Sequence, residues 1–177
     1  MFYFLYPFSF LCYNIYTKLK LIYLCQKKLK VYLDTSVIGG CFDEEFSFWS
    51  QKIIEDFRKG KISLYLSTIT EAEMVDAPDE VKELFYELLE LGVVFIEENE
   101  ESLNLADKYI DENILSKNYR DDARHIAIAT ISDIDVLVSW NFKHIVHYDK
   151  IRKFNSVNMR EGYKPIDIYS PMEVANE

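Results

Sequence analysis

The chain has 177 residues, an apolar fraction of 49% and a formal net charge of −10. This length and composition exclude a low-complexity or disordered protein and indicate a single globular domain with a sizeable core. Its three cysteines, Cys12, Cys25 and Cys41, are odd in number and not closely paired. They favour reduced thiols in a cytoplasm over a zinc knuckle or a redox motif.

Charge is unevenly distributed along the chain. Residues 1–30 contain five lysines and no acid, so residues 31–177 carry 15 basic and 30 acidic groups. This excess of acids argues against nucleic-acid binding over the whole surface. Residues 143–164, however, carry six basic groups and two acids, which could form a local patch for phosphate or only a solvated helix face.

The amino terminus, residues 1–28, is an apolar and basic extension. Residues 1–16 are almost wholly apolar and aromatic, and Lys18 and Lys20 precede a second apolar stretch, residues 21–25. The order is wrong for a signal peptide, and each apolar stretch is shorter than the roughly 20 residues of a membrane span. An interfacial anchor, a docking segment and sequence translated upstream of the true start all remain open. We favour the last and predict no firm membrane partner.

Strands alternate with helices from Leu29 onwards. Leu29–Asp34 predicts a buried strand, because β-branched and aromatic residues cluster there, and the Asp-Thr-Ser that follows can cap a helix. Apolar residues at helical spacing predict a helix over residues 46–57 that stops at Gly60, and residues 62–66 predict a second strand. These elements form a β-α-β unit.

The alternation continues to the carboxyl terminus. Thr70 is expected to open a short helix and Pro78 the next one, which ends at Gly92. The remaining expected elements are strands at residues 93–96, 136–139 and 166–169, the last at an edge, and helices at residues 103–110, 123–131 and 151–158. The pattern predicts a three-layer α/β/α sandwich with a central, mainly parallel sheet and a ligand site at the carboxyl ends of its strands.

Four segments place an acid, or its amide, where a strand or helix can direct it into one pocket. The four residues are Asp34, Glu73, Asp122 and Asn141. Carboxylates gathered without a cationic partner repel one another, so the arrangement indicates a divalent cation. The sequence therefore predicts a metal site, provided that the strands carrying Asp34 and Asn141 are neighbours.

Each of these residues also has a simpler structural interpretation. Asp34 could cap a helix, Glu73 could be solvated like its neighbour Glu71, and Asp122 could interact with a helix dipole as readily as Asp121. His125 lies three residues after Asp122 on the same helix face, where a histidine is more often structural than catalytic. Ser139 could orient a ligand water.

Taken together, the four segments resemble the motifs of the PIN-domain family, the metal-dependent ribonuclease fold of VapC-like toxins. The resemblance covers about Lys30 to Val174, within a domain expected at residues 29–177. Leu-Asp-Thr-Ser, Thr-x-x-Glu and Asp-Ala-Arg-His-Ile-Ala resemble the first three motifs, and they select Glu73 over Glu71 and Asp122 over Asp121. Ser139-Trp-Asn141 resembles the fourth, with Asn in place of the usual Asp.

The resemblance implies a cytoplasmic, Mg²⁺- or Mn²⁺-dependent endoribonuclease, the toxin of a type II toxin–antitoxin pair. The cation would be held by Asp34, Glu73, Asp122 and Asn141, with Ser139 and His125 as accessory residues. It would polarise the phosphoryl oxygen of RNA and activate a water. Because Asn141 lacks charge, one metal ion is easier to defend than two. An antitoxin and a homodimer are further expectations. The basic residues expected to contact RNA are Lys143, Lys150, Arg152 and Lys153.

Two other functions remain open. A phosphatase could use Asp34 as a nucleophile, but Ser36 occupies the position where the haloacid-dehalogenase pattern requires a second Asp. A catalytically weak module with the same fold could bind RNA or protein without cutting it. Labelled phosphate trapped on Asp34 would support the first alternative, and metal-dependent RNA binding without cleavage would support the second.

Overall fold

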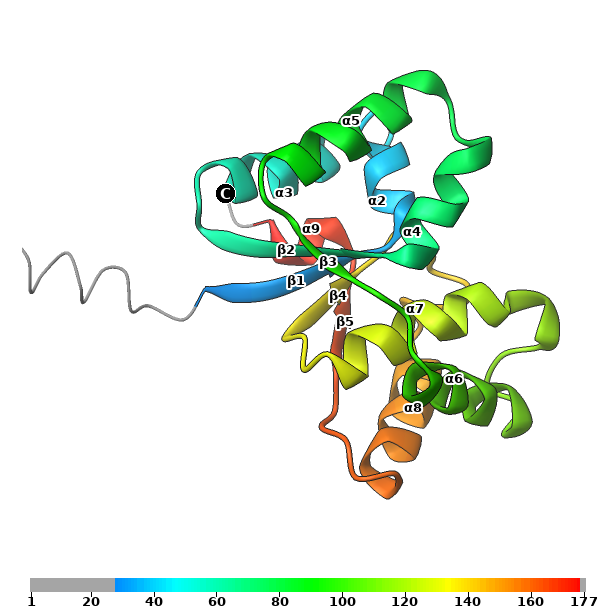
Figure 1. The fold of residues 1–177 in the computed structure, drawn as a ribbon. Helices are drawn as coiled ribbons and strands as arrows, with labels where there is room; N and C mark the ends of the chain where they lie inside the picture. Colours follow the sequence, from blue (N-terminus) through cyan, green and yellow to red (C-terminus); the bar gives the residue numbers. More distant parts are fainter. Residues whose placement is uncertain (1–27, 176–177) are drawn as a thin grey trace, which may run out of the picture.

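A computed structural model describes residues 28–175, and a five-stranded parallel sheet lies at the centre of this part of the chain (Figure 1). The strand order is β3-β2-β1-β4-β5. The bounds are β1 Leu29–Leu33, β2 Ile62–Ser67, β3 Val94–Ile96, β4 Val136–Val138 and β5 Asp167–Tyr169. The chain therefore builds outward from β1 to β3 and then crosses back to add β4 and β5 on the other side of β1.

Side chains of the central strands alternate between two hydrophobic cores, as a period of two requires. Val31 and Leu33 of β1 face one core, whereas Tyr32 faces the other. Strand β4 repeats the pattern, because Val136 and Val138 share the core of Val31 while Leu137 shares that of Tyr32. Both faces of the sheet are covered, which explains why these strands read as continuous apolar runs.

One helical layer covers the core that contains Val31 and Leu33. In Figure 1 its helices α2, α3 and α5 lie above the sheet. Short α9 joins this core through Val174 and Ala175 and packs against α3. The bounds are α2 Thr35–Gly40, α3 Ser47–Arg58, α5 Asp79–Glu90 and α9 Pro171–Val174.

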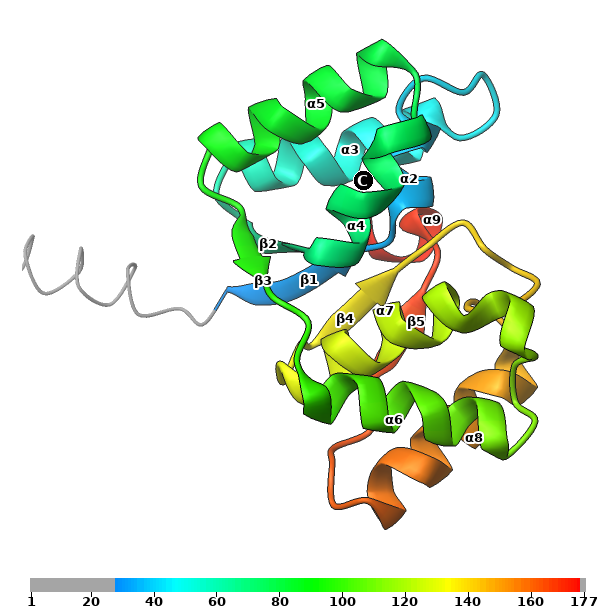
Figure 2. The ribbon, with the colours of Figure 1, turned by 45° about the vertical axis from the view of Figure 1, so that its right-hand side comes forward.

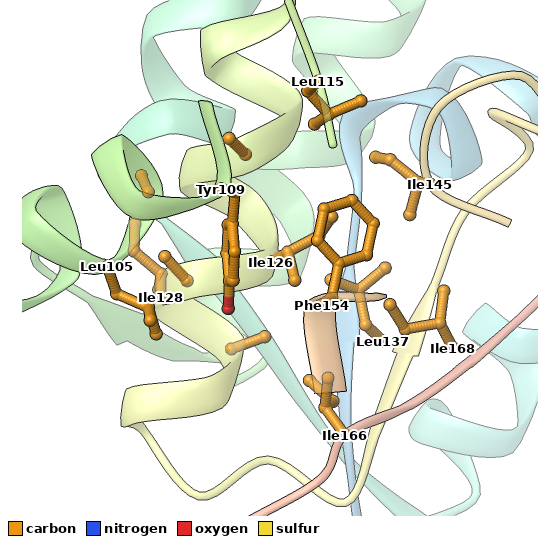
Figure 3. Close-up of a cluster of buried hydrophobic side chains, with 14 of the residues drawn as sticks. Leu105, Tyr109, Leu115, Ile126, Ile128, Leu137, Ile145, Phe154, Ile166 and Ile168 are labelled. Atoms are coloured by element: carbon orange, nitrogen blue, oxygen red, sulfur yellow. The ribbon is translucent and has the colours of Figure 1, made fainter. Parts of the chain in front are cut away.

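A second layer covers the opposite face, where α6, α7 and α8 lie below the sheet in Figure 1 and come forward in Figure 2. Their bounds are α6 Glu100–Asp111, α7 Arg120–Ile131 and α8 Tyr148–Arg160. The rings of Tyr109 and Phe154 meet edge to face with centroids 5.0 Å apart in the middle of this core (Figure 3). The hydroxyl of Tyr109 donates to Asn158 Oδ1, so the buried polar tip is satisfied.

The structure confirms the three-layer α/β/α arrangement, and within residues 28–175 the sheet is wholly parallel. Short α4, Thr68–Glu73, follows β2, and two 3₁₀ turns, η1 Met74–Asp76 and η2 Lys117–Tyr119, connect longer helices. The expectation that Thr70 opens α4 was wrong. Ser67 caps this helix, its side chain accepting from Ile69 N–H, while Thr70 Oγ1 accepts from Ser67 N–H.

Residues 1–27 and 176–177 lie outside the described residues, so the extension at residues 1–28 and the domain at residues 29–177 stay predictions. In the described part of the chain, every helix is too short or too polar to traverse a lipid bilayer.

Candidate metal centre

Asp34 and Asn141 lie at the carboxyl ends of two neighbouring strands. Strand β1 pairs with β4 from Val31 to Leu33, and Asp34 N–H extends the ladder to Val138 O at 3.0 Å. The adjacency that the sequence argument required is therefore present. The junction of β1 and β4 is the point at which the strand order reverses, because β2 and β3 lie on one side of β1 whereas β4 and β5 lie on the other. Open α/β sheets bind ligands at such a point.

The carboxylate of Asp34 does not cap α2, although Asp34 occupies the N-cap position. Its Oδ2 instead accepts from Ser36 Oγ at 2.7 Å and from Ser139 Oγ. The side chain is only 8% exposed. Two hydroxyl donors and burial thus fix Asp34 at the strand end, and the simple capping interpretation of this residue is wrong.

The two serines are themselves held by the backbone that follows β4. Ser36 Oγ accepts from Trp140 N–H at 3.0 Å, and Ser139 Oγ accepts from Asn141 N–H at 2.9 Å. Each hydroxyl accepts from the backbone and donates to Asp34, so its direction is determined. Ser139 therefore lies in contact with the carboxylate of Asp34, and its role in orienting a ligand water stays a prediction.

Glu73 reaches the same pocket from the end of α4. Its Oε2 accepts from Thr35 Oγ1 and lies 3.2 Å from His125 Nε2. His125 Nε2 lies 3.7 Å from Asp34 Oδ1, and the imidazole is only 1% exposed. The structure therefore brings together Asp34, Glu73 and His125, whereas Glu71 is exposed to solvent.

His125 supplies a cationic partner that the sequence argument had assumed to be absent. Burial alone would lower its pKa, but the electrostatic effect of Tyr32, the hydrogen bond to Glu73 and the charges of Asp34 and Glu73 raise the pKa well above 6.5. Burial would raise the pKa of Glu73, yet the hydrogen bond and charge of His125 lower it below 4.5. In the metal-free protein the two groups therefore form an imidazolium–carboxylate pair.

Asp122 approaches this group from the first turn of α7, which begins at Arg120 and not at residue 123 as expected. Burial, followed by the charge of Asp34, raises the pKa of Asp122 from 3.8 to about 6. Asn141 Nδ2 donates to Asp122 Oδ1 at 3.1 Å, and Asn141 Oδ1 accepts from His144 N–H at 3.0 Å. Asn141 thus connects Asp122 to the β4 loop.

The neighbouring acid, Asp121, points elsewhere. It forms an ion pair with Arg124 at 2.6 Å, and its side chain is 61% exposed. The charges of Asp34 and Glu73, in contrast, act on Asp122. Geometry therefore separates two adjacent carboxylates that the sequence could distinguish only by resemblance.

The donor atoms fit a small divalent cation. Asp34, Glu73 and His125 each offer one ligand atom, and these atoms all lie within 4.8 Å of one another. Bonds of about 2.1 Å place adjacent ligands of one octahedral ion about 3 Å apart and opposite ligands about 4.2 Å apart. Asp122 and Asn141 lie outside that three-residue group but border it through the contacts given above. In the metal-free protein, three ionised carboxylates and one imidazolium leave two negative charges, and this excess of negative charge favours the binding of a divalent cation.

A basic and aromatic surface adjoins Asp122 and Asn141. In the described part of the chain, no carboxylate forms an ion pair with Lys143, Lys150, Arg152 or Lys153. The charge of Asp122 acts on Lys150, whose Nζ donates to Lys143 O at 2.9 Å. Tyr119 stacks on His144 with centroids 3.6 Å apart.

The basic groups farther along the same sequence window are paired with acids. Arg160 pairs with Glu112, and Lys164 pairs with Asp133 at 2.7 Å. The unpaired positive charge of the window is therefore concentrated in residues 143–153.

The three-layer arrangement around this parallel sheet is a PIN-like fold. Two solved structures share it. "FitAcB from Neisseria gonorrhoeae" aligns with 14% identity and a TM-score of 0.52, covering 81% of this chain and 99% of that chain. "VapBC-1 from nontypeable Haemophilus influenzae" aligns with 15% identity, the same TM-score and the same coverage. No family model and no curated protein matches the sequence.

Proposed function

We propose that this protein is a metal-dependent endoribonuclease that hydrolyses RNA phosphodiester bonds, acting as the toxin of a type II toxin–antitoxin pair. The observation that supports this most strongly is the pocket itself. Asp34, Glu73, His125 and Asp122 lie up to 91 positions apart in the sequence, yet they interact through hydrogen bonds or charge. Their net negative charge at a strand switch point suits a cation more than a neutral ligand.

In this proposal Asp34, Glu73, Asp122 and Asn141 are the catalytic and metal-holding residues. A bound Mg²⁺ or Mn²⁺ would supply a Lewis acid for the phosphoryl oxygen and lower the pKa of a water. Asp34 is held in place by Ser36 and Ser139, so its position needs no rearrangement for binding. Asp122, with a pKa of about 6, can hold or release a proton near neutral pH.

The basic surface at Lys143, Lys150, Arg152 and Lys153 is proposed to bind the RNA backbone. Each phosphate contact with single-stranded nucleic acid contributes about 0.7 to the slope of log affinity against log salt. Tyr148, 72% exposed and lying under the Arg152 guanidinium, offers a face on which an unpaired base can stack. Reversing the charges of Arg152 and Lys153 should weaken RNA binding and reduce the salt slope by about 1.4. Unchanged affinity would discard this surface.

The decisive test is cleavage of an RNA pool by the purified protein with Mg²⁺ or Mn²⁺. Wild type should give products that EDTA abolishes, and Asp34→Ala combined with Asp122→Ala should give none. Asp121→Ala is the matched control, because Asp121 is exposed and bound to Arg124, and it should cleave as wild type does. Equal cleavage by the double variant would refute the proposal.

A second candidate is a module of the same fold that binds RNA or protein without cutting it. His125 favours it, because an imidazolium between Asp34 and Glu73 stabilises the pocket without a metal. Asn141 also lacks the charge usual at its position. RNA binding that persists after Asp122→Asn, with no cleavage products under any divalent metal, would select the module.

The remaining predictions concern partners and location. An antitoxin that occludes the pocket, a homodimer and a cytoplasmic location are proposed together with the nuclease function. Mass measurement of the protein purified from its own cells would reveal a second chain in a fixed ratio or a doubled mass. A single chain at every concentration would remove both partners.

A further inference from the structure

We propose that His125 Nε2 is a direct ligand of the cation, which makes the centre a mixed nitrogen and oxygen site that prefers Mn²⁺ to Mg²⁺. The inference rests on the proposed function, because it assumes that a cation binds beside Asp34 and Glu73. It goes further by naming the ligand that determines the choice of metal.

The position of the ring supports ligation. His125 Nε2 lies 3.2 Å from Glu73 Oε2 and 3.7 Å from Asp34 Oδ1. Both separations fall between the roughly 3 Å of adjacent and the roughly 4.2 Å of opposite ligands around one octahedral ion. The imidazole is 1% exposed, so Nε2 faces the carboxylates and not bulk solvent. An ion held by both acids would therefore lie within bonding reach of this nitrogen.

The other ring nitrogen has the partner that a metal-bound histidine requires. His125 Nδ1 lies 2.6 Å from Tyr32 Oη, and Tyr32 Oη lies 2.6 Å from Ser67 Oγ. A continuous arrangement has Nδ1–H donating to Tyr32 and the tyrosine hydroxyl donating to Ser67. When a cation binds, the Nε2 proton of the metal-free imidazolium is released to solvent, and this arrangement then leaves the Nε2 lone pair directed at the pocket. A polar group that fixes the tautomer in this way is the usual support of a ligating histidine.

The choice of metal follows from the donor set. Mg²⁺ prefers oxygen ligands and retains its waters, whereas imidazole suits later first-row cations and Mn²⁺ accepts both donor types. Asp34 and Glu73 supply oxygen and His125 supplies nitrogen. The site should therefore bind Mn²⁺ more tightly than Mg²⁺, and His125 should be the residue that creates the difference.

The experiment is electron spin echo envelope modulation of the full-length protein loaded with Mn²⁺. Directly bound imidazole nitrogen gives a characteristic nuclear coupling, and labelling with ¹⁵N-histidine should change it. The chain contains three histidines, so single substitutions assign the signal. His125→Gln should abolish the coupling and lower Mn²⁺ affinity by about tenfold or more, with a smaller loss for Mg²⁺.

Two variants serve as controls. His147→Gln changes an exposed histidine and should leave coupling and affinity unchanged. Tyr32→Phe removes the hydroxyl but not the ligand, so it should retain the coupling while lowering Mn²⁺ affinity by about tenfold. The wild-type spectrum remains decisive even if His125→Gln fails to fold.

The outcomes separate this inference from the proposed function. Mn²⁺ bound at the Asp34 site without nitrogen coupling, or with a coupling that survives in folded His125→Gln, overturns His125 as a ligand and leaves the metal centre intact. Absence of any Mn²⁺ binding that depends on Asp34 defeats the proposed function itself.

Discussion

The two sides of the pocket hold their carboxylates by different physical means. On the strand side, Asp34 is buried and receives two hydroxyl donors, Ser36 and Ser139. On the helix side, Glu73 and Asp122 are only partly buried, and burial tends to raise the pKa of both. The hydrogen bond and charge of His125 lower the pKa of Glu73, whereas the charge of Asp34 raises that of Asp122 further. Hydroxyl donors act at every pH, whereas the helix side changes its charge near neutrality.

The strand side therefore fixes the position of one carboxylate, whereas the helix side adjusts the net charge of the site. Asp34 is a fixed ligand whose direction is set before any cation arrives. Glu73, His125 and Asp122 form a group whose net charge can adjust to whether a cation is present. The comparison predicts that removing the charge of Asp34 will cause the largest loss of cation affinity, whereas substitutions on the helix side will mainly change the strength of binding and its pH dependence.

The largest effect is expected for Asp34→Asn. The amide retains an oxygen that can accept from Ser36 and Ser139, but it lacks the charge that a cation requires. Mn²⁺ affinity should fall about 100-fold, equivalent to about 2.8 kcal/mol, as measured by calorimetric titration. Affinity within threefold of wild type would show that the strand side does not hold the ion.

Glu73→Gln should have a smaller effect, because the Glu73 side chain is 35% exposed and water can replace its oxygen. We expect Mn²⁺ affinity to fall by about 20-fold. The pKa of His125 should fall as well, because its hydrogen-bonded carboxylate is lost. Histidine NMR titration follows this change. An unaltered His125 titration would contradict the proposed interaction between Glu73 and His125.

Ser139→Ala tests whether hydroxyl positioning matters on the strand side. The variant retains the charge of Asp34 and removes one of its two donors. Mn²⁺ affinity should fall by about tenfold, and the free energy of unfolding should fall by about 1–2 kcal/mol. Ser156→Ala, at an exposed serine of α8, is the matched control and should change neither value.

The smallest change in free energy is expected for Asp122→Asn. This change is a gain in the stability of the metal-free protein, not a loss. The folded pKa of Asp122 is about 6 against an ordinary 3.8, so the wild type loses stability as pH rises from about 4 to 6. The variant removes that loss and should be more stable at pH 7 by about 1 kcal/mol, after allowance for solvent screening. Chemical denaturation without metal at pH 4 and pH 7 measures it.

The control for this prediction is Asp121→Asn, which alters an exposed acid bound to Arg124. Its effect should be within about 0.5 kcal/mol at both pH values. A gain at pH 7 that is equal for the two variants would mean that general surface charge, and not the pocket, sets the stability.

The sequence predicted the central strands well and the local detail of the site less well. The apolar run at residues 29–34 is ended by a polar turn, so its pattern is unambiguous, and β1 lies within one residue of the expected bounds. Helix α9 was missed because it has only four residues, too few for a helical period. The Ser67 cap was missed because Thr70 is an equally good residue for a helix start, although it lies two residues after Thr68, the first residue of α4.

The role of His125 was the least visible feature of the site. Its partners Glu73 and Tyr32 lie 52 and 93 positions away, and only the fold brings them to the same ring. The spacing from Asp122 to His125 was the one local signal, because residues three apart share a helix face. A pattern of that kind shows that two side chains are neighbours, but it does not show which charges the rest of the chain adds.

The most direct measurement for the whole account is an anomalous difference map from crystals of the full chain grown with Mn²⁺. The account predicts one strong peak beside Asp34, within about 2.0–2.3 Å of its carboxylate, with Glu73 or Asp122 bound to the same ion directly or through water. The peak should vanish in Asp34→Asn. No peak between β1 and β4, or a strong peak only elsewhere on the surface, would contradict it.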